Sequence, residues 1–211
     1  AIACRLAGDH CPSVRVHLVR TPFFNAQMAP NGIMQVWSGL LLRMANEAQL
    51  AAVLGHEIGH YLCRHSVERL RDAKSRSAFG QFLGIALGAA GAGNVGAISQ
   101  MLILAGMFSY TRDQEREADR IGLDLMVRAG YPTIEASRVW GQLIEEQQAQ
   151  AEWTGEPDNR SVLFASHPPQ EERLQVLAEM AAAMPGDAAR DVGEEAYQRM
   201  TAPHRRAFLE D

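Results

Sequence analysis

The stretch HEIGH at residues 56–60 carries the residue types of a metal-dependent hydrolase. On an α-helix His56 and His60 are four positions apart, so both imidazoles project from nearly the same face and can bind one metal ion. Neutral imidazole suits Zn²⁺, and a carboxylate next to the metal can take a proton from water as that water attacks a carbonyl. We therefore predict that His56 and His60 bind zinc, one ion per chain, and that Glu57 is the general base.

A chance occurrence of this motif is the competing interpretation. Against it, the motif lies inside a predicted helix that Asn46 caps, and Gly55 and Gly59 stand beside the two histidines. Glycine lets another element of the fold approach closely, as a shared metal site requires. We therefore interpret the motif as a metal site.

A catalytic zinc needs a third protein ligand and one open position. His65 is the nearest candidate in the sequence. The metzincin pattern would need glycine at position 63 and histidine at position 66, where this chain has Cys63 and Ser66, so that class is excluded. We expect His65 to be a surface histidine and Cys63 to be a buried structural thiol.

Glu115 and Asp119 are a second pair four residues apart on a predicted helix. One of these carboxylates can bind zinc and the other can accept a hydrogen bond from a ligating imidazole, which is the pattern of a gluzincin. Because Asp113, Glu117 and Asp124 lie nearby, the spacing alone leaves open a solvated charged face.

The elements that position these residues are predicted to form an α+β fold that is mainly helical. Alternating apolar residues predict a small antiparallel sheet within residues 14–37, and its second strand carries Asn25 and Ala26. Capping signals then predict a zinc helix over 46–74 and a second helix over 111–130.

Residues 77–110 are apolar and are predicted to form a helical hairpin, interrupted by the glycines of 91–96. Each half is shorter than the roughly 20 residues that cross a bilayer as a helix. Either the hairpin packs on the protein or residues 79–108 touch a membrane. Helices are also predicted within 170–211, and the chain reads as one domain over residues 1–211.

Composition excludes one class of partner. The 211 residues carry a net charge of −5 and a pI near 5.8, which argues against a nucleic-acid-binding surface. Cys4 and Cys11 are close enough to pair, and a pair would favour an oxidising compartment. The first residues lack a signal peptide, as a mature or trimmed chain also would.

The segments HEIGH, EREAD and SHP together resemble the family of type-one CAAX prenyl proteases, HtpX-like heat-shock proteases and BepA-like periplasmic proteases. The segment NAQMAPNGIMQVWSGLL ahead of the first motif is also similar, and the order and spacing agree from Phe24 to about Arg173. The resemblance implies that Glu115 is the third zinc ligand and that Asp119 supports a ligating histidine, with Glu117 a neighbour only.

The resemblance also implies how a substrate binds. The strand with Asn25 and Ala26 would form the cleft edge to which an extended peptide adds by backbone hydrogen bonds. His167 would approach the zinc, either occupying the open position at rest or helping to hold the transition-state oxyanion, and Arg173 would act with it. Residues 27–31 depart from the family pattern.

These patterns lead us to expect a zinc-dependent endopeptidase that hydrolyses peptide bonds in unfolded or misassembled proteins. By resemblance we place it in quality control at the bacterial envelope, in the periplasm or on a membrane facing it. The main alternative is a non-catalytic chaperone or scaffold protein that contains zinc. A prenyl-protein processing enzyme would show several membrane spans, and none is convincing here.

Overall fold

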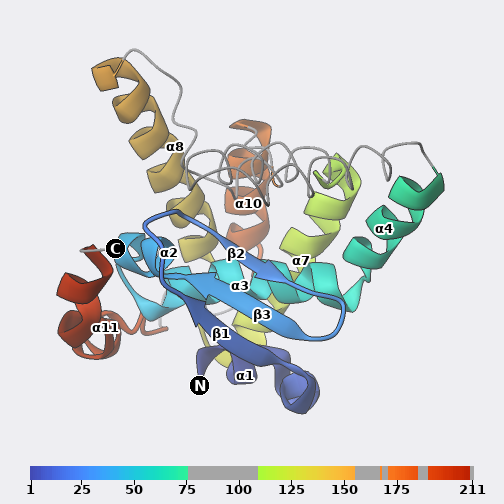
Figure 1. Cartoon of the computed structure of the whole chain (residues 1–211), viewed down its shortest axis with the longest axis horizontal. Helices are drawn as coiled ribbons and strands as arrows, with labels where there is room; N and C mark the ends of the chain where they lie inside the picture. Colours follow the sequence, from blue (N-terminus) through green and yellow to red (C-terminus); the bar gives the residue numbers. More distant parts are fainter. Residues whose placement is uncertain (76–108, 155–166, 168–170, 185–189, 210–211) are drawn as a thin grey trace, which may run out of the picture.

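The computed structural model describes residues 1–75, 109–154, 167, 171–184 and 190–209 (Figure 1). The described residues form helices and one small sheet, so the prediction of a mainly helical α+β fold is confirmed. In chain order the elements are α1 (Ile2–Ala7), the 3-10 helix η1 (Gly8–Ser13), β1 (Arg15–Val19), β2 (Ala26–Met28), β3 (Ile33–Trp37), α2 (Ser38–Arg43), α3 (Glu47–Leu62), α4 (His65–Ser75), α7 (Arg112–Ala129), α8 (Ile134–Thr154), α10 (Glu171–Ala182) and α11 (Glu194–Leu209).

The sheet has the strand order β1-β3-β2 and lies across α3 (Figure 1). β2 and β3 pair antiparallel through a tight turn at Gly32, whose φ is 82°, whereas β1 pairs parallel to β3. The prediction of a wholly antiparallel sheet is therefore wrong for β1. A tight turn joins only β2 to β3, and the chain after β1 crosses to the far side of β3, which makes β1 and β3 parallel.

The long helix predicted over 46–74 is two helices. Asn46 caps α3 by accepting a hydrogen bond from the backbone N–H of Gln49, as expected. α3 then ends at Leu62, because Arg64 takes a left-handed conformation with φ 60°. α4 starts again at His65, so the residues after the zinc motif leave the direction of the first helix.

The second motif helix begins and ends where the sequence predicts. Thr111 and Gln114 form a reciprocal capping box at the start of α7, and Gly130 ends it in the left-handed conformation. α7 crosses α3 and makes its most extensive helix contact there. Two carboxylates of its first two turns, Glu115 and Asp119, consequently face the HEIGH segment.

Small residues bring α3 and α7 into backbone contact. A Cβ added to Gly59 would lie 2.7 Å from the carbonyl oxygen of Ala118, and one added to Gly122 would lie 3.0 Å from the backbone nitrogen of His56. No larger side chain fits at Gly59 without a backbone shift. The glycines beside the two histidines therefore set the distance between the two motif helices.

Outside the motif helices, Cys4 and Cys11 form a disulfide, which confirms the predicted pair. Cys63 is a free, partly exposed thiol, so the prediction of a buried thiol there is wrong. Most of the apolar segment predicted as a hairpin over 77–110 lies outside the described residues. Among the described residues, no helix has the length and apolar character needed to cross a bilayer.

Candidate metal centre

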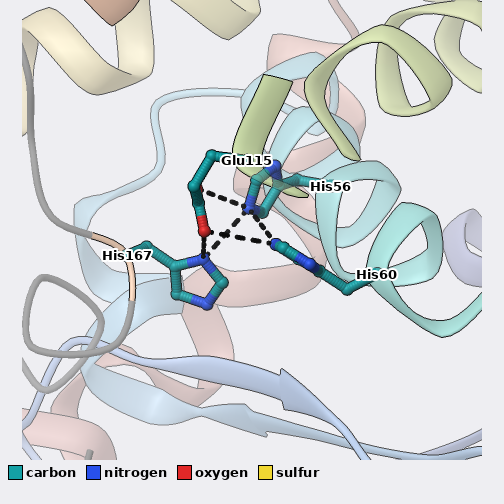
Figure 2. A group of neighbouring side chains, drawn as sticks. All are labelled: His56, His60, Glu115 and His167. Carbon is teal, nitrogen blue, oxygen red and sulfur yellow. Dashed lines mark hydrogen bonds and ion pairs between the residues drawn. The ribbon is translucent and has the colours of Figure 1, made fainter. Parts of the chain in front are cut away.

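Four buried side chains converge between α3 and α7. His56 and His60 come from consecutive turns of α3, Glu115 comes from the first turn of α7, and His167 precedes α10 (Figure 2). The ligand atoms of the four residues all lie within 4.8 Å of one another. Three segments far apart in the sequence thus contribute to one cluster.

The spacing of these atoms fits a tetrahedral metal ion. His56 Nε2 lies 3.0 Å from His60 Nε2 and 3.1 Å from His167 Nδ1. Glu115 Oε1 lies 3.4 Å from His60 Nε2 and 2.8 Å from His167 Nδ1. Ligands of a tetrahedral zinc with ordinary bond lengths are about 3.3 Å apart. Three nitrogens and one carboxylate oxygen are also the donors that zinc prefers, so the residues fit the metal.

Glu57 lies beside this cluster with its side chain fully buried. Its Oε1 atom has no hydrogen-bond partner among the described residues and lies 3.4 Å from His167 Nε2. A buried carboxylate oxygen without a partner is costly and usually has a functional reason. This oxygen is placed to accept a proton in the cluster.

His56 is held from behind by ionised groups. Its Nδ1 donates a hydrogen bond to Asp119 Oδ1 at 2.8 Å, and Arg173 Nε donates to Asp119 Oδ2 at 2.8 Å. Arg173 also lies 2.7 Å from Glu115 Oε2 and 4.3 Å above the ring of Trp140. One buried guanidinium therefore bridges two of the three carboxylates of the EREAD segment, Glu115 and Asp119.

The carboxylates set the electrostatics of the cluster. Burial and Arg173 lower the pKa of His56, but Asp119 and Glu115 outweigh them and raise it to about 9. Burial raises the pKa of Glu115, but His167 and His56 hold it well below its usual range. The same negative charge that favours a proton on His56 favours a metal cation bound there.

His60 has different neighbours. Its Nδ1 lies 2.9 Å from Nδ1 of His65, and its ring stacks on Tyr110 with centroids 3.6 Å apart. Burial, and then His56, lower the pKa of His60 to about 2, so its imidazole is neutral as a metal ligand must be. His65 is only 2 % exposed, so the prediction of a surface histidine is wrong.

The edge of the sheet beside α3 is formed by β2. Trp37 N–H donates to the carbonyl of Asn25 and Ala29 N–H donates to the carbonyl of Ile33, so these residues face β3. In an antiparallel pair the alternate residues face away, and in β2 these are Ala26 and Met28. Of the two predicted substrate-binding residues, Ala26 therefore presents its backbone at the open edge, and Asn25 does not.

A cavity of about 420 Å³ opens between this edge and α3. Met28 and Pro30 line it on the sheet side, and His60, Leu62 and Val67 line it on the helix side. The cavity therefore connects the strand edge with one of the presumed ligands.

Comparison with known proteins agrees with this geometry. A model of peptidase family M48 matches residues 2–181. The chain belongs to peptidase family M48. The resemblance predicted from the HEIGH, EREAD and SHP segments is thereby confirmed at the level of the family.

Several M48 relatives are similar over most of this chain. They are the mitochondrial metalloendopeptidase OMA1 of Schizosaccharomyces pombe, 32% identical over 78% of the chain, the metalloprotease YcaL of Escherichia coli, 31% over 77%, and the beta-barrel assembly-enhancing protease of Escherichia coli, 31% over 74%. The chain spans 45%, 60% and 34% of these proteins, respectively. A metallopeptidase family implies a metal, and the His56, His60, Glu115 and His167 group is one that could bind it.

The structure thus brings seven of the nine predicted site residues together. They are the buried cluster and the Asp119–Arg173 pair that contacts it: His56, Glu57, His60, Glu115, Asp119, His167 and Arg173. Of the other two predicted residues, Ala26 begins β2 and Asn25 directly precedes it. The sequence interpretation missed the contacts of His65, Tyr110 and Glu117 around His60. No local pattern signals them, because they arise from tertiary packing. The break between α3 and α4 brings His65 to His60, and the crossing of α7 over α3 brings Tyr110 onto His60 and Glu117 onto His65.

Proposed function

We propose that this M48 chain carries the catalytic domain of a zinc-dependent endopeptidase. His56, His60 and Glu115 would hold the metal, one ion per chain, and Glu57 would be the general base. The observation that carries the proposal is the set of separations of 2.8 to 3.4 Å among the donor atoms, which matches a tetrahedral ion. The buried, unpartnered oxygen of Glu57 beside them supports it.

The chemistry follows from the positions of the protein groups. Zinc in this site would polarise the scissile carbonyl and make water more acidic. Glu57 would take a proton from that water at Oε1 and return it to the amine nitrogen of the cleaved bond. Asp119, held by Arg173, would keep Nδ1 of His56 protonated so that Nε2 faces the metal.

His167 would act as a latch on the resting site. Its Nδ1 lies 3.1 Å from His56 Nε2 and 2.8 Å from Glu115 Oε1, at the fourth corner of the donor group. Its Nε2 also lies 3.4 Å from Glu57 Oε1. A histidine in this place blocks the position that substrate needs, so catalysis would require His167 to withdraw.

A protein substrate would bind as an extended strand along β2. Ala26 and Met28 present backbone groups at the edge, and the neighbouring cavity can take a substrate side chain beside His60. Unfolded or misassembled proteins supply such strands. The relative named as a beta-barrel assembly-enhancing protease supports a role in quality control at the bacterial envelope, on the periplasmic side.

The test is metal content measured together with cleavage of unfolded casein, in the native chain and in Glu57→Gln and His167→Ala. We expect about one zinc per chain in all three, no cleavage by Glu57→Gln, and faster cleavage by His167→Ala than by the native chain. Zinc without cleavage in the native chain and in His167→Ala would favour the scaffold alternative. A native chain that binds no metal would refute the proposal.

A further inference from the structure

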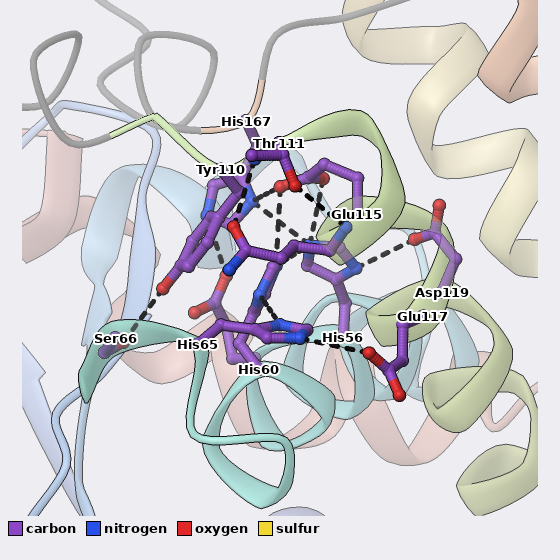
Figure 3. A network of polar contacts seen from close by, with 12 residues as sticks. His56, His60, His65, Ser66, Tyr110, Thr111, Glu115, Glu117, Asp119 and His167 are labelled. Atoms are coloured by element: carbon purple, nitrogen blue, oxygen red, sulfur yellow. Dashed lines mark hydrogen bonds and ion pairs between the residues drawn. The ribbon is translucent and has the colours of Figure 1, made fainter. Parts of the chain in front are cut away.

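His65 and Glu117 extend the polar contacts of the metal centre away from His60. His60 Nδ1 lies 2.9 Å from His65 Nδ1, and His65 Nε2 lies 3.3 Å from Glu117 Oε2 (Figure 3). We propose that His65 is a positioning residue that fixes the ring of His60 for metal binding, and that Glu117 in turn fixes His65. This inference rests on the proposed metal site.

The break between α3 and α4 creates this contact. In an uninterrupted helix, residue 65 would lie about 140° around the axis from residue 60 and could not reach it. Instead α3 ends at Leu62, Arg64 takes a φ of 60°, and His65 starts α4 with its side chain in contact with that of His60. His65 is buried there, while the carboxylate of Glu117 is half exposed.

Only one arrangement of protons fits these contacts and a bound metal. When His60 Nε2 faces the metal, its Nδ1 must carry the hydrogen. Nδ1 of His65 must then be the acceptor, which leaves the hydrogen of His65 on Nε2, and that N–H can donate to Glu117 Oε2. Each ring nitrogen of His60 and His65 then has a partner, and neither imidazole needs to be charged.

His60 depends on this series of contacts more than His56 depends on any single partner. His56 is held by Asp119, which Arg173 fixes with two hydrogen bonds. Among the described residues, the Nδ1 atom of His60 has His65 as its hydrogen-bond partner. Tyr110 stacks on the face of His60 and limits its tilt, but it cannot choose the tautomer.

A second metal ion is the rival explanation, because Cys63, His65 and Glu117 also form a group of possible ligands. An ion on His65 Nε2 would force the hydrogen of His65 onto Nδ1. Two N–H groups would then face each other across the 2.9 Å between His60 and His65. Such an ion would therefore oppose the metal on His60, whereas a hydrogen-bonded His65 supports it.

The experiment measures zinc affinity of the full chain by competition with a chelator, for His65→Leu, His65→Asn and the exposed control His17→Leu. Leucine fills the space without an acceptor, and asparagine can place an oxygen near the position of Nδ1. We expect His65→Leu to weaken zinc binding by about 10- to 100-fold, as loss of such a partner usually does. His65→Asn should recover most of this loss, and His17→Leu should bind like the native chain.

The outcomes separate three explanations. Equal affinity of His65→Leu and the native chain, or equal losses in His65→Leu and His65→Asn, would overturn the positioning role while leaving the metal site intact. A second zinc per chain that is lost in Cys63→Ser would also overturn it in favour of the rival site. Absence of zinc from the native chain would instead refute the proposed function. Thermal unfolding of each metal-free variant verifies that it folds.

Discussion

The two histidines of the HEIGH segment lie one helical turn apart but are held in different ways. Behind His56 lies a buried ionic group, in which Asp119 of α7 and Arg173 of α10 form two hydrogen bonds. On the other side of His60, side-chain contacts lead through His65 to the half-exposed Glu117. The His56 side therefore joins three helices, while the His60 side joins the α3–α4 break to the surface of α7.

This difference predicts which substitutions should lower both the stability of the fold and metal binding, and which should lower metal binding alone. A buried ion pair that loses one partner leaves an uncompensated charge, so changes on the His56 side should unfold the protein as well as weaken its metal site. Among the described residues, the contacts from His60 through His65 to Glu117 include no ion pair with both partners buried. Changes there should weaken metal binding with little loss of stability.

The largest effect is expected from Asp119→Asn, for which Glu117→Gln is the matched control. Each change removes one carboxylate charge from α7. Asp119→Asn leaves the Arg173 guanidinium partly unpaired in the interior, so it should lower the free energy of unfolding by about 3 kcal/mol. Glu117→Gln, at a half-exposed carboxylate, should change it by less than about 0.5 kcal/mol. Similar losses in urea unfolding would contradict the comparison.

Metal removal tests whether an ion at the proposed site joins the two sides. At a free zinc concentration 100 times the dissociation constant, binding should add about 2.7 kcal/mol to the free energy of unfolding. Thermal unfolding with and without chelator measures this difference. His56→Ala and His60→Ala should both abolish it, and a chelator effect that survives in either variant would place the stabilising ion elsewhere.

Gly59→Ala tests the helix contact that the two sides share. The new Cβ would lie 2.7 Å from the carbonyl oxygen of Ala118, so the α3 and α7 backbones must separate. We expect a loss of about 1–3 kcal/mol in chemical unfolding and weaker zinc binding. Gly141→Ala is the matched control, because among the described residues its Cβ would meet only a Leu174 methyl at 3.7 Å. This control should be neutral or slightly stabilising, and a loss equal to that of Gly59→Ala would argue against the contact.

The smallest effect concerns the break on the His60 side. Arg64 holds a φ of 60°, a conformation that glycine adopts without steric cost. Arg64→Gly should therefore leave the free energy of unfolding unchanged or raise it by up to about 1 kcal/mol, and zinc affinity should stay native. Arg64→Val should be destabilising, since a β-branched residue is strained at this φ. If both variants behave alike in thermal unfolding, the break does not depend on residue 64.

The sequence by itself determined the part of the site that lies on regular helices. His56, Glu57 and His60 follow from helical spacing, and the caps at Asn46 and Thr111 locate the starts of α3 and α7 because capping is a local interaction. Helical spacing also places Glu115 and Asp119 on one face. The resemblance, rather than the spacing, distinguished their roles.

Only the tertiary structure decided what happens where the chain changes direction. The break at Arg64 turns His65 back under His60, and the crossover after β1 makes that strand parallel to β3. The pairing of β2 leaves the backbone of Ala26, not that of Asn25, at the open edge. Such features depend on contacts between residues far apart in the sequence, which the local periodicity of the chain does not predict.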